Sequence, residues 1–164
     1  MAGLVMLSLQ LLMLLIAANG SPVLAKRLFG KHFTLPVDGG LRCRDGRPLL
    51  GASKTWRGMI TATLSCALIA ELIGLSALFG ALFGLLSMLG DLLSSFCKRR
   101  LGLASSARAT GLDQLPEALL PLLMGKYWLD YAWWPVVLVA GLFMALEMMA
   151  SPLLFRLGVR SRPY

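Results

Sequence analysis

MITATLSCALIAELIG, residues 59–74, is followed without a gap by LSALFGALFGLLSMLGDLLSSF, residues 75–96, in the middle of the chain. A helix that crosses a bilayer needs about 20 mostly apolar residues, and both runs are close to that length. Because no linker separates them, they predict an antiparallel helical hairpin. Gly80 and Gly84, four residues apart in the second run, favour close packing against a neighbouring helix.

Three further apolar runs flank this hairpin, at residues 4–18, 115–131 and 135–157. Hydrophobic residues make up 57% of the 164 residues and charged residues 15%, against about 25% charged in soluble domains. This composition, with a mean hydropathy of +0.74, argues against a soluble, disordered or nucleic-acid-binding protein, although the pI is near 10. We therefore expect an all-α integral membrane protein. It would be a single domain over residues 1–164, with five transmembrane helices and long loops at 19–58 and 97–114.

The basic residues give this arrangement an orientation. The first long loop carries eight of them, the second loop four and the C-terminal tail three, so all but Lys126 of the 16 fall on one side of the five spans. Cytoplasmic loops are enriched in Lys and Arg. The pattern predicts an outside N-terminus and a cytoplasmic C-terminus in the cell's cytoplasmic membrane. No basic residue precedes the first run and Ile16-Ala17-Ala18 is a poor cleavage site, so we expect that run to be a retained helix.

Aromatic residues gather at the expected turn between the fourth and fifth spans, on the opposite side. Amphipathic rings prefer the headgroup layer of a membrane, which favours an interfacial belt over a site that stacks on a cofactor. The predicted belt consists of Tyr127, Trp128, Tyr131, Trp133 and Trp134.

An acidic residue lies within the third span. Asp91 is 16 residues beyond Leu75, about 24 Å along a helix that rises ~1.5 Å per residue, which places it close to the inner membrane interface. Ser87, Asp91, Ser94 and Lys98 share one helical face. An acid at this depth indicates a functional site or an ion pair. An ion pair between Asp91 and Lys98, or a nearby Arg, is the structural alternative.

A second acid, Asp113, begins the fourth span at a similar depth. Its structural alternative is a helix N-cap or first-turn acid. Two carboxylates near several basic side chains favour a site for a magnesium-bound polyphosphate, since Mg²⁺ binds one or two carboxylates together with phosphate oxygens. The basic side chains expected there are Lys54, Arg57, Lys98, Arg99 and Arg100.

Other motifs carry weaker signals. Gly51-x-x-Lys54-Thr55 lacks the spacing of a phosphate-binding loop. His32 has no partner for a metal site or a catalytic triad, and the three cysteines form no zinc pattern. Asp38 and Asp45 each precede glycine, which is equally consistent with a metal or hydroxyl ligand and with an Asx turn.

Taken in order over the five apolar runs, these motifs resemble the CDP-archaeol synthase family, a small branch related to the phosphatidate cytidylyltransferases. The resemblance covers residues 19–123. It implies that CTP and a phospholipid acid react with Mg²⁺ at the cytoplasmic membrane face, giving CDP-lipid and pyrophosphate. It rests on Asn19-Gly20-Ser21-Pro22, Pro36-Val37-Asp38-Gly39-Gly40, Asp45-Gly46-Arg47, Lys54-Thr55-Trp56-Arg57-Gly58, Gly90-Asp91-Leu92-x-x-Ser95-Phe96-x-Lys98-Arg99-Arg100 and Asp113-Gln114.

The resemblance also implies roles for the residues of these motifs. Asp91 and Asp113 would bind Mg²⁺, and Lys54 and Arg57 would bind phosphate groups of CTP or lipid. Lys98 and Arg99 would hold the lipid phosphate or the departing pyrophosphate. The expected substrate-binding set is completed by Thr55, Ser94, Ser95, Arg100 and Gln114. Segment 105–110 lacks the Lys-Asp and Gly-His-Gly-Gly elements of the wider cytidylyltransferases.

Three interpretations remain open at this point. Trp56 either stacks on cytosine or anchors the protein at the membrane interface. The alternatives to an enzyme are a small transporter or channel subunit with an ion path along Glu71, Asp91 and Glu147, and a non-catalytic scaffold that binds anionic lipid. An ether-linked and an ester-linked lipid acid are both consistent with the pattern, as are a monomer and a homodimer.

Overall fold

The computed structural model describes residues 2–104, 107 and 109–156, with side chains described as far as Ala150. Arg108, Arg160, Arg162 and the side chain of Arg156, which were counted in the charge pattern, lie outside this description, as does much of segment 105–110. The described chain forms five helices, α1 (Ala2–Phe29), α2 (Trp56–Leu72), α3 (Ala77–Arg100), α4 (Gln114–Leu129) and α5 (Trp133–Arg156). In that part of the chain the only β structure is two isolated bridges, Pro36–Thr55 and Arg42–Pro48. The expectation of an all-α protein is confirmed.

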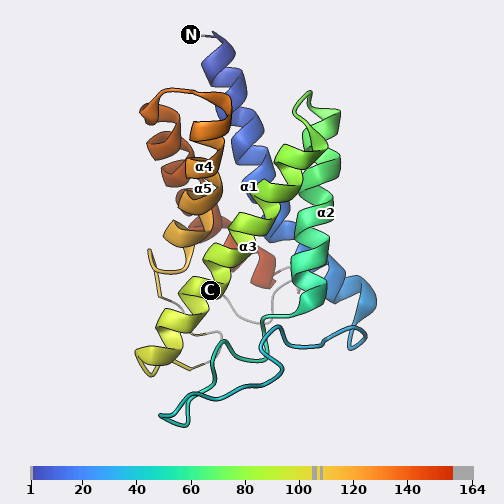
Figure 1. Ribbon diagram of the computed structural model, residues 1–164, viewed down its shortest axis with the longest axis vertical. Helices are drawn as coiled ribbons and strands as arrows, with labels where there is room; N and C mark the ends of the chain where they lie inside the picture. Colours follow the sequence, from blue (N-terminus) through green and yellow to red (C-terminus); the bar gives the residue numbers. More distant parts are fainter. Residues whose placement is uncertain (1, 105–106, 108, 157–164) are drawn as a thin grey trace.

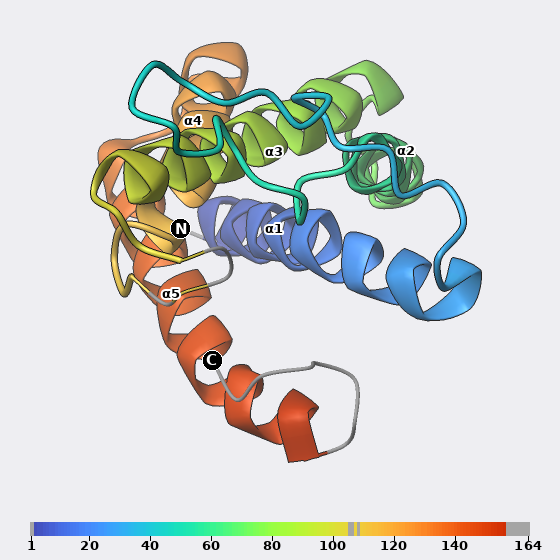
Figure 2. The same cartoon turned by 90° about the horizontal axis from the view of Figure 1, so that it is seen from below.

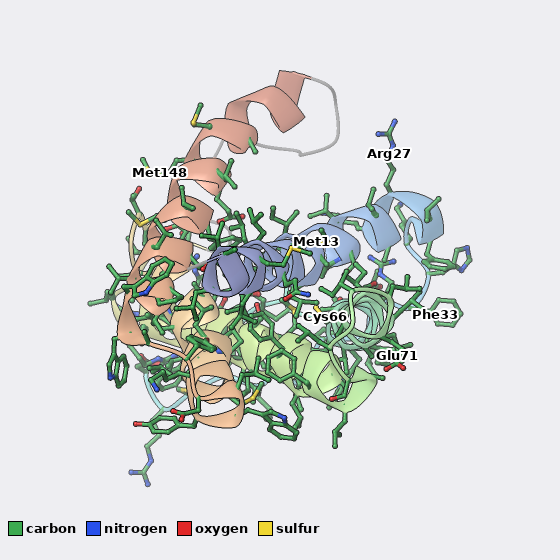
Figure 3. All side chains as sticks on the ribbon, turned by 90° about the horizontal axis from the view of Figure 1, so that it is seen from above. Met13, Arg27, Phe33, Cys66, Glu71 and Met148 are labelled. Carbon is green, nitrogen blue, oxygen red and sulfur yellow. The ribbon has the colours of Figure 1, made fainter. Side chains whose placement is uncertain are left out.

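The helices run up and down, with the two kinds of connection at opposite ends. Figure 1 shows the short α2–α3 and α4–α5 turns at the end where α1 begins, and the long segment 30–55 together with residues 101–104 and 109–113 at the other end. The core is built from apolar side chains of all five helices, among them Leu14, Cys66, Phe83, Leu122 and Phe143. In Figure 3, Cys66 points into the bundle, whereas Arg27 and Phe33 project away from it.

The first helix is longer than the sequence pattern predicts. We expected it to end at Ala18, but α1 continues through Pro22 to Phe29. Ala18 and Ala25, seven residues apart on one face, are both buried, and Pro22 packs against Gly58 at the start of α2. Packing on both sides of the proline therefore keeps the helix continuous although one backbone hydrogen bond is lost. The first long loop consequently spans residues 30–55 rather than 19–58.

The predicted helical hairpin is present, and its glycines form the contact. A Cβ atom on Gly80 would overlap the backbone carbonyl of Cys66, and one on Gly84 would overlap Ala62 and Cys66. The α2 and α3 backbones therefore meet where the small residues permit it. Glu71 accepts a hydrogen bond from Ala77 N at 2.9 Å and so closes the α2–α3 turn.

Within the described residues, three helices are long and apolar enough to cross a membrane: α1, α3 and the Trp133–Ala150 part of α5. The other two expected spans form helices of 17 residues in α2 and 16 in α4, each short of the usual 20. Apolar side chains nevertheless cover the outer face of α2 as well as that of α1, including Leu9, Ile16, Leu64 and Leu68.

The expected aromatic belt is present with one exception. Tyr127, Trp128, Trp133 and Trp134 are exposed around the α4–α5 turn. Tyr131 is buried instead, and its hydroxyl donates to the Leu122 carbonyl at 2.7 Å. Asp130 ends α4 in the left-handed conformation, after which the chain turns the next side chain inward. Tyr131 is thus a core residue, and its assignment to the belt was wrong.

Candidate functional site

The first long loop places a lysine against α3. Seen from the loop-bearing end, segment 30–55 crosses α3 before it enters α2 (Figure 2). Val37 N donates to the Lys54 carbonyl at 2.9 Å, and Trp56 N donates to the Leu35 carbonyl at 3.1 Å. These bonds hold the residues just before α2 in an extended conformation. They fix the backbone on both sides of Lys54 and thereby position its side chain.

Asp38 organises the same loop. Its carboxylate accepts hydrogen bonds from Gly40 N at 2.9 Å, Leu50 N at 2.9 Å and Gly51 N at 3.1 Å. Burial opposes ionisation, but these N–H donors outweigh it and hold the pKa of Asp38 below its usual value. Asp45 likewise accepts from Arg47 N at 3.1 Å. Both acids therefore make the Asx turns that were one of their two interpretations.

Asp91 forms an ion pair with Lys54. The Lys54 Nζ atom lies 2.7 Å from Asp91 Oδ1 and 2.6 Å from Oδ2. Both side chains are about three-quarters buried, at 20% and 28% exposure. Burial alone would lower the pKa of Lys54, but the charge and hydrogen bonds of Asp91 raise it above its ordinary value. The pair joins the loop to α3, whereas the structural alternative had paired Asp91 with Lys98 or an arginine.

A second ion pair lies at the junction of α3 and α4. Lys98 Nζ contacts Asp113 Oδ1 at 2.5 Å and the Ala107 carbonyl at 3.2 Å. The other oxygen of Asp113 accepts from Ala109 N at 2.9 Å. Asp113 makes no side-chain N-cap bond to its own helix. It holds the preceding loop instead, with help from Gln114, whose Oε1 accepts from Gly111 N at 2.9 Å.

The two pairs share α3. Asp91 pairs with Lys54 and, seven residues further along the helix, Lys98 pairs with Asp113, so that both pairs lie on one face of α3. These four residues, here called the cluster, connect segment 51–55, α3 and the residue before α4, and the charges of Glu117 and Asp113 also act on Lys54.

Residues around Lys54 have other contacts. Thr55 caps α2 by accepting from Gly58 N at 3.3 Å. Arg57 Nη1 donates to the carbonyls of Gly30 at 3.1 Å and His32 at 2.7 Å, and so fastens the end of α1 to α2. Trp56 borders an apolar groove of about 330 Å³ with Phe29, Phe33, Leu35, Arg57, Ile60 and Thr61. This setting favours the interfacial-anchor interpretation of Trp56 over cytosine stacking.

Most of the remaining basic and hydroxyl side chains donate hydrogen bonds to backbone carbonyls. Arg99 Nη2 donates to the Ala104 carbonyl at 2.8 Å. Arg100 pairs with Asp45 at 2.8 Å and also donates to the Pro48 carbonyl. Ser94 donates to the Gly90 carbonyl within α3 at 3.0 Å, and Ser95 is buried. Lys54, Asp91, Lys98 and Asp113 are therefore gathered in the cluster, while Thr55, Arg57 and Arg100 hold the loops around it.

The sequence-based set omitted one acid near this cluster. Glu117 is only 4% exposed, and the backbone of Pro116 and Glu117 is packed directly against Gly90, the neighbour of Asp91. The signal was present in the sequence. Glu117 is an acid inside an apolar run, four residues after Asp113, and the rule for membrane-embedded acids that singled out Asp91 applies to it equally.

In the described part of the chain, no group of three or more His, Cys, Asp or Glu side chains forms a ready-made metal cage. The donors present are carboxylates on α3 and α4. Such a set suits an ion that keeps waters and takes further oxygens from a bound phosphate, which is the habit of Mg²⁺. Lys54 and Lys98 are placed to neutralise an anionic ligand at the same point.

Comparisons with known proteins point to one family. A family model described as "CarS-like: CDP-archaeol synthase" matches residues 1–164. The CDP-archaeol synthase of Hyperthermus butylicus is 44% identical over 122 residues, covering 68% of this chain and 69% of that protein. The CDP-archaeol synthase of Sulfurisphaera tokodaii is 36% identical over 158 residues, covering 91% of this chain and 90% of that protein.

The fold has a solved counterpart. A structure described as an intramembrane enzyme for archaeal membrane lipids biosynthesis matches with a TM-score of 0.70 and 32% identity, over 86% of this chain and 90% of that chain. The match confirms a membrane-embedded helical fold, and the sequence matches confirm the resemblance seen in the motifs. The chain belongs to the CDP-archaeol synthase family.

Proposed function

We propose that this protein is a CTP-dependent cytidylyltransferase that converts a phospholipid acid to CDP-lipid and pyrophosphate. Family membership supports lipid cytidylyl transfer. The observation that carries the assignment to particular residues is the placement of the Lys54–Asp91 and Lys98–Asp113 pairs on one face of α3 at the loop-bearing end of the bundle. These pairs provide both signs of charge that a metal-bound triphosphate requires.

The reaction requires no protein nucleophile. An oxygen of the lipid phosphate attacks the α-phosphorus of CTP, the bond between the α-phosphorus and the bridging oxygen breaks, and pyrophosphate leaves. Catalysis of such a transfer consists mainly of positioning and of neutralising charge. Lys54 and Lys98 are the positioned cations. Arg99 adds a third positive charge, on which the charge of Asp113 also acts.

Mg²⁺ would supply additional neutralisation of the phosphate oxygens. The carboxylates at the inner ends of α3 and α4, Asp91 and Asp113 in the sequence-based assignment, would hold it. Each of these carboxylates is paired with a lysine. Each ion pair neutralises a largely buried carboxylate and ammonium, and a metal-bound triphosphate would give each group an opposite charge of its own.

All five helices would cross the membrane in this proposal, with the N-terminus outside and the site facing the cytoplasm. The excess of Lys and Arg at the loop-bearing end supports that orientation. Glu71 argues against an ion path, since it lies at the opposite end and caps α3 through Ala77 N. The lipid phosphate, which lies in the headgroup layer, would thus reach the cluster without leaving the bilayer.

Purified protein in detergent provides the test. With labelled CTP, Mg²⁺ and either an ether-linked or an ester-linked phospholipid acid, we expect labelled CDP-lipid, and we expect none when EDTA replaces Mg²⁺. Asp91→Asn should reduce turnover at least 1,000-fold, whereas Asp130→Asn, at the exposed opposite end of the molecule, should leave it unchanged. Full activity in Asp91→Asn would remove Asp91 from the mechanism. Ion flux in liposomes without CDP-lipid formation would favour the transporter.

A further inference from the structure

The end of α1 reaches the depth of the lipid headgroups. The first apolar run of the sequence stops at Ala18, but the helix continues to Phe29 and contains 28 residues. At ~1.5 Å per residue its length is about 42 Å, against about 30 Å for a hydrocarbon core. The turns beyond Pro22 lie at the loop-bearing end of the bundle. In Figure 3, Arg27 and Phe33 project there, away from the other helices.

This part of the chain carries unpaired positive charge. Segment 19–35 contains three basic residues and no acidic one, and the side chains of Lys26, Arg27 and Lys31 are all exposed. None of the four ion pairs in the described part of the chain includes them. The lysines of the cluster are paired with acids, whereas these three charges are available to an anionic partner.

An apolar groove of about 330 Å³ lies next to these basic residues. None of the four cluster residues lines it. On the outer face of α2 it is continued by Leu64 and Leu68, which follow Ile60 at intervals of four residues and are 64% and 63% exposed. Contiguous exposed apolar surface of this kind marks an interaction site. The large apolar side chains of the groove are 46–75% exposed and are Phe29, Phe33, Leu35, Trp56 and Ile60.

One wall of the groove is held in a strained conformation. Phe33 has a φ of 56°, in the left-handed region that bulky residues rarely adopt. Arg57 fixes the turn before it by donating to the carbonyls of Gly30 and His32. The Phe33 ring is thereby kept 75% exposed, with only an edge-on contact to Phe29 at 6.2 Å between ring centroids. Strain that holds an apolar ring outside the core points to a contact beyond the chain.

The combination of charge and apolar surface selects the partner. Lysine and arginine near a membrane surface attract anionic headgroups, and a zwitterionic headgroup has no net charge to offset three unpaired cations. A second copy of this chain would bring the same three positive charges to the contact.

We propose that the junction of α1 and α2 binds an anionic membrane phospholipid, with a hydrocarbon chain in the groove and the phosphate at Lys26, Arg27 and Lys31. The bound lipid is a phosphodiester, so it has no terminal phosphate group to react with a nucleotide. The site is separate from the cluster, and the inference goes beyond the proposed function without depending on it.

Trp56 provides the means to test this site. The chain has four tryptophans, and the other three lie around the α4–α5 turn at the opposite end. The variant Trp128→Phe/Trp133→Phe/Trp134→Phe is placed in phosphatidylcholine nanodiscs that contain a small fraction of lipid with brominated chains, which quench tryptophan fluorescence. We expect brominated phosphatidylglycerol to quench Trp56 at a concentration at least fivefold lower than brominated phosphatidylcholine. In Trp56→Phe, the three remaining tryptophans should respond alike to the two lipids.

Charge variants of the Trp56-only protein identify the headgroup contacts. Lys26→Gln/Arg27→Gln/Lys31→Gln should reduce the preference for phosphatidylglycerol to less than twofold. Arg42→Gln/Arg44→Gln, which removes exposed charge from the loop at the same end but outside the groove, should retain the preference. All of these side chains are exposed, so we expect the melting temperatures to match that of the parent protein.

Equal quenching of Trp56 by the two brominated lipids would overturn the inference, because the groove would then contact lipid without selecting its headgroup. Loss of the preference in Arg42→Gln/Arg44→Gln would overturn it too, since general surface charge would be the cause. Brominated phosphatidic acid that outcompetes phosphatidylglycerol more than tenfold would assign the groove to the substrate instead. Absence of CDP-lipid synthesis while the expected quenching pattern holds would count against the proposed function only.

Discussion

At the residue scale, the two lysine–carboxylate pairs show how four charged side chains are held in the interior of the bundle. Lys54 and Asp91 are both largely buried, and each would be unstable there alone. Sequence spacing predicted that Asp91 lies near the membrane interface, but it could not identify the partner, because Lys54 belongs to a segment 37 residues away. Only the loop hydrogen bonds through Leu35 and Val37 bring the two together.

Exchanging the charges of this pair separates its contribution to stability from its proposed role in catalysis. Asp91→Asn alone should lower stability by about 1–3 kcal/mol, because it leaves a buried ammonium without its partner. The double variant Lys54→Asp/Asp91→Lys restores an ion pair, so we expect its melting temperature in detergent to recover most of that loss. Its CDP-lipid synthesis should remain absent, because the carboxylate is then on the loop and the ammonium on α3.

Activity recovered in the charge-exchanged protein would contradict the roles assigned to Lys54 and Asp91. It would show that the cluster needs only a balanced charge. The single variant Lys54→Met provides the comparison, since it removes the cation while leaving Asp91 on its helix.

At the element scale, glycines determine how closely the helices approach. The four-residue spacing of Gly80 and Gly84 predicted the α2–α3 contact, and it is confirmed. The α3–α4 contact at Gly90 was not predicted. It uses one glycine, so there is no four-residue pair of small residues to indicate it. The extension of α1 through Pro22 was missed for a similar reason: tertiary packing against Gly58 overrides the local preference of the Asn-Gly-Ser-Pro segment.

Adding one methyl group at these glycines tests both contacts. Gly80→Ala and Gly90→Ala should each destabilise the protein by about 1–3 kcal/mol, because the new Cβ would overlap backbone of the facing helix. Only Gly90→Ala pushes α3 away from α4 beside Asp91. We therefore expect Gly90→Ala to lose far more CDP-lipid synthesis than Gly80→Ala, although the two variants are destabilised to a similar extent. Gly141→Ala on α5, where a Cβ meets nothing within 4 Å, is the matched control.

At the scale of the whole molecule, composition and loop charge predicted the all-α membrane class, and the family matches support the function inferred from the motifs. The details of the site were less accessible. Thr55, Arg57 and Arg100 lie in the right motifs, yet they bind backbone carbonyls, cap a helix or pair with Asp45. A basic residue that steadies a loop and one that binds phosphate look alike in a sequence, because only the folded loop distinguishes their partners.

The orientation of the bundle gives the last prediction. Asp130 is almost fully exposed at the end with the short turns, and Cys43 lies in the loop at the other end. If the loop-bearing end faces the cytoplasm, a membrane-impermeant maleimide should label Asp130→Cys but not Cys43 in right-side-out vesicles. Inside-out vesicles should give the reverse, and Cys66, buried between α1 and α2, should stay unlabelled in both. Labelling of Cys43 only from outside would show the opposite orientation. The proposed site would then lie on the side of the membrane away from cytoplasmic CTP.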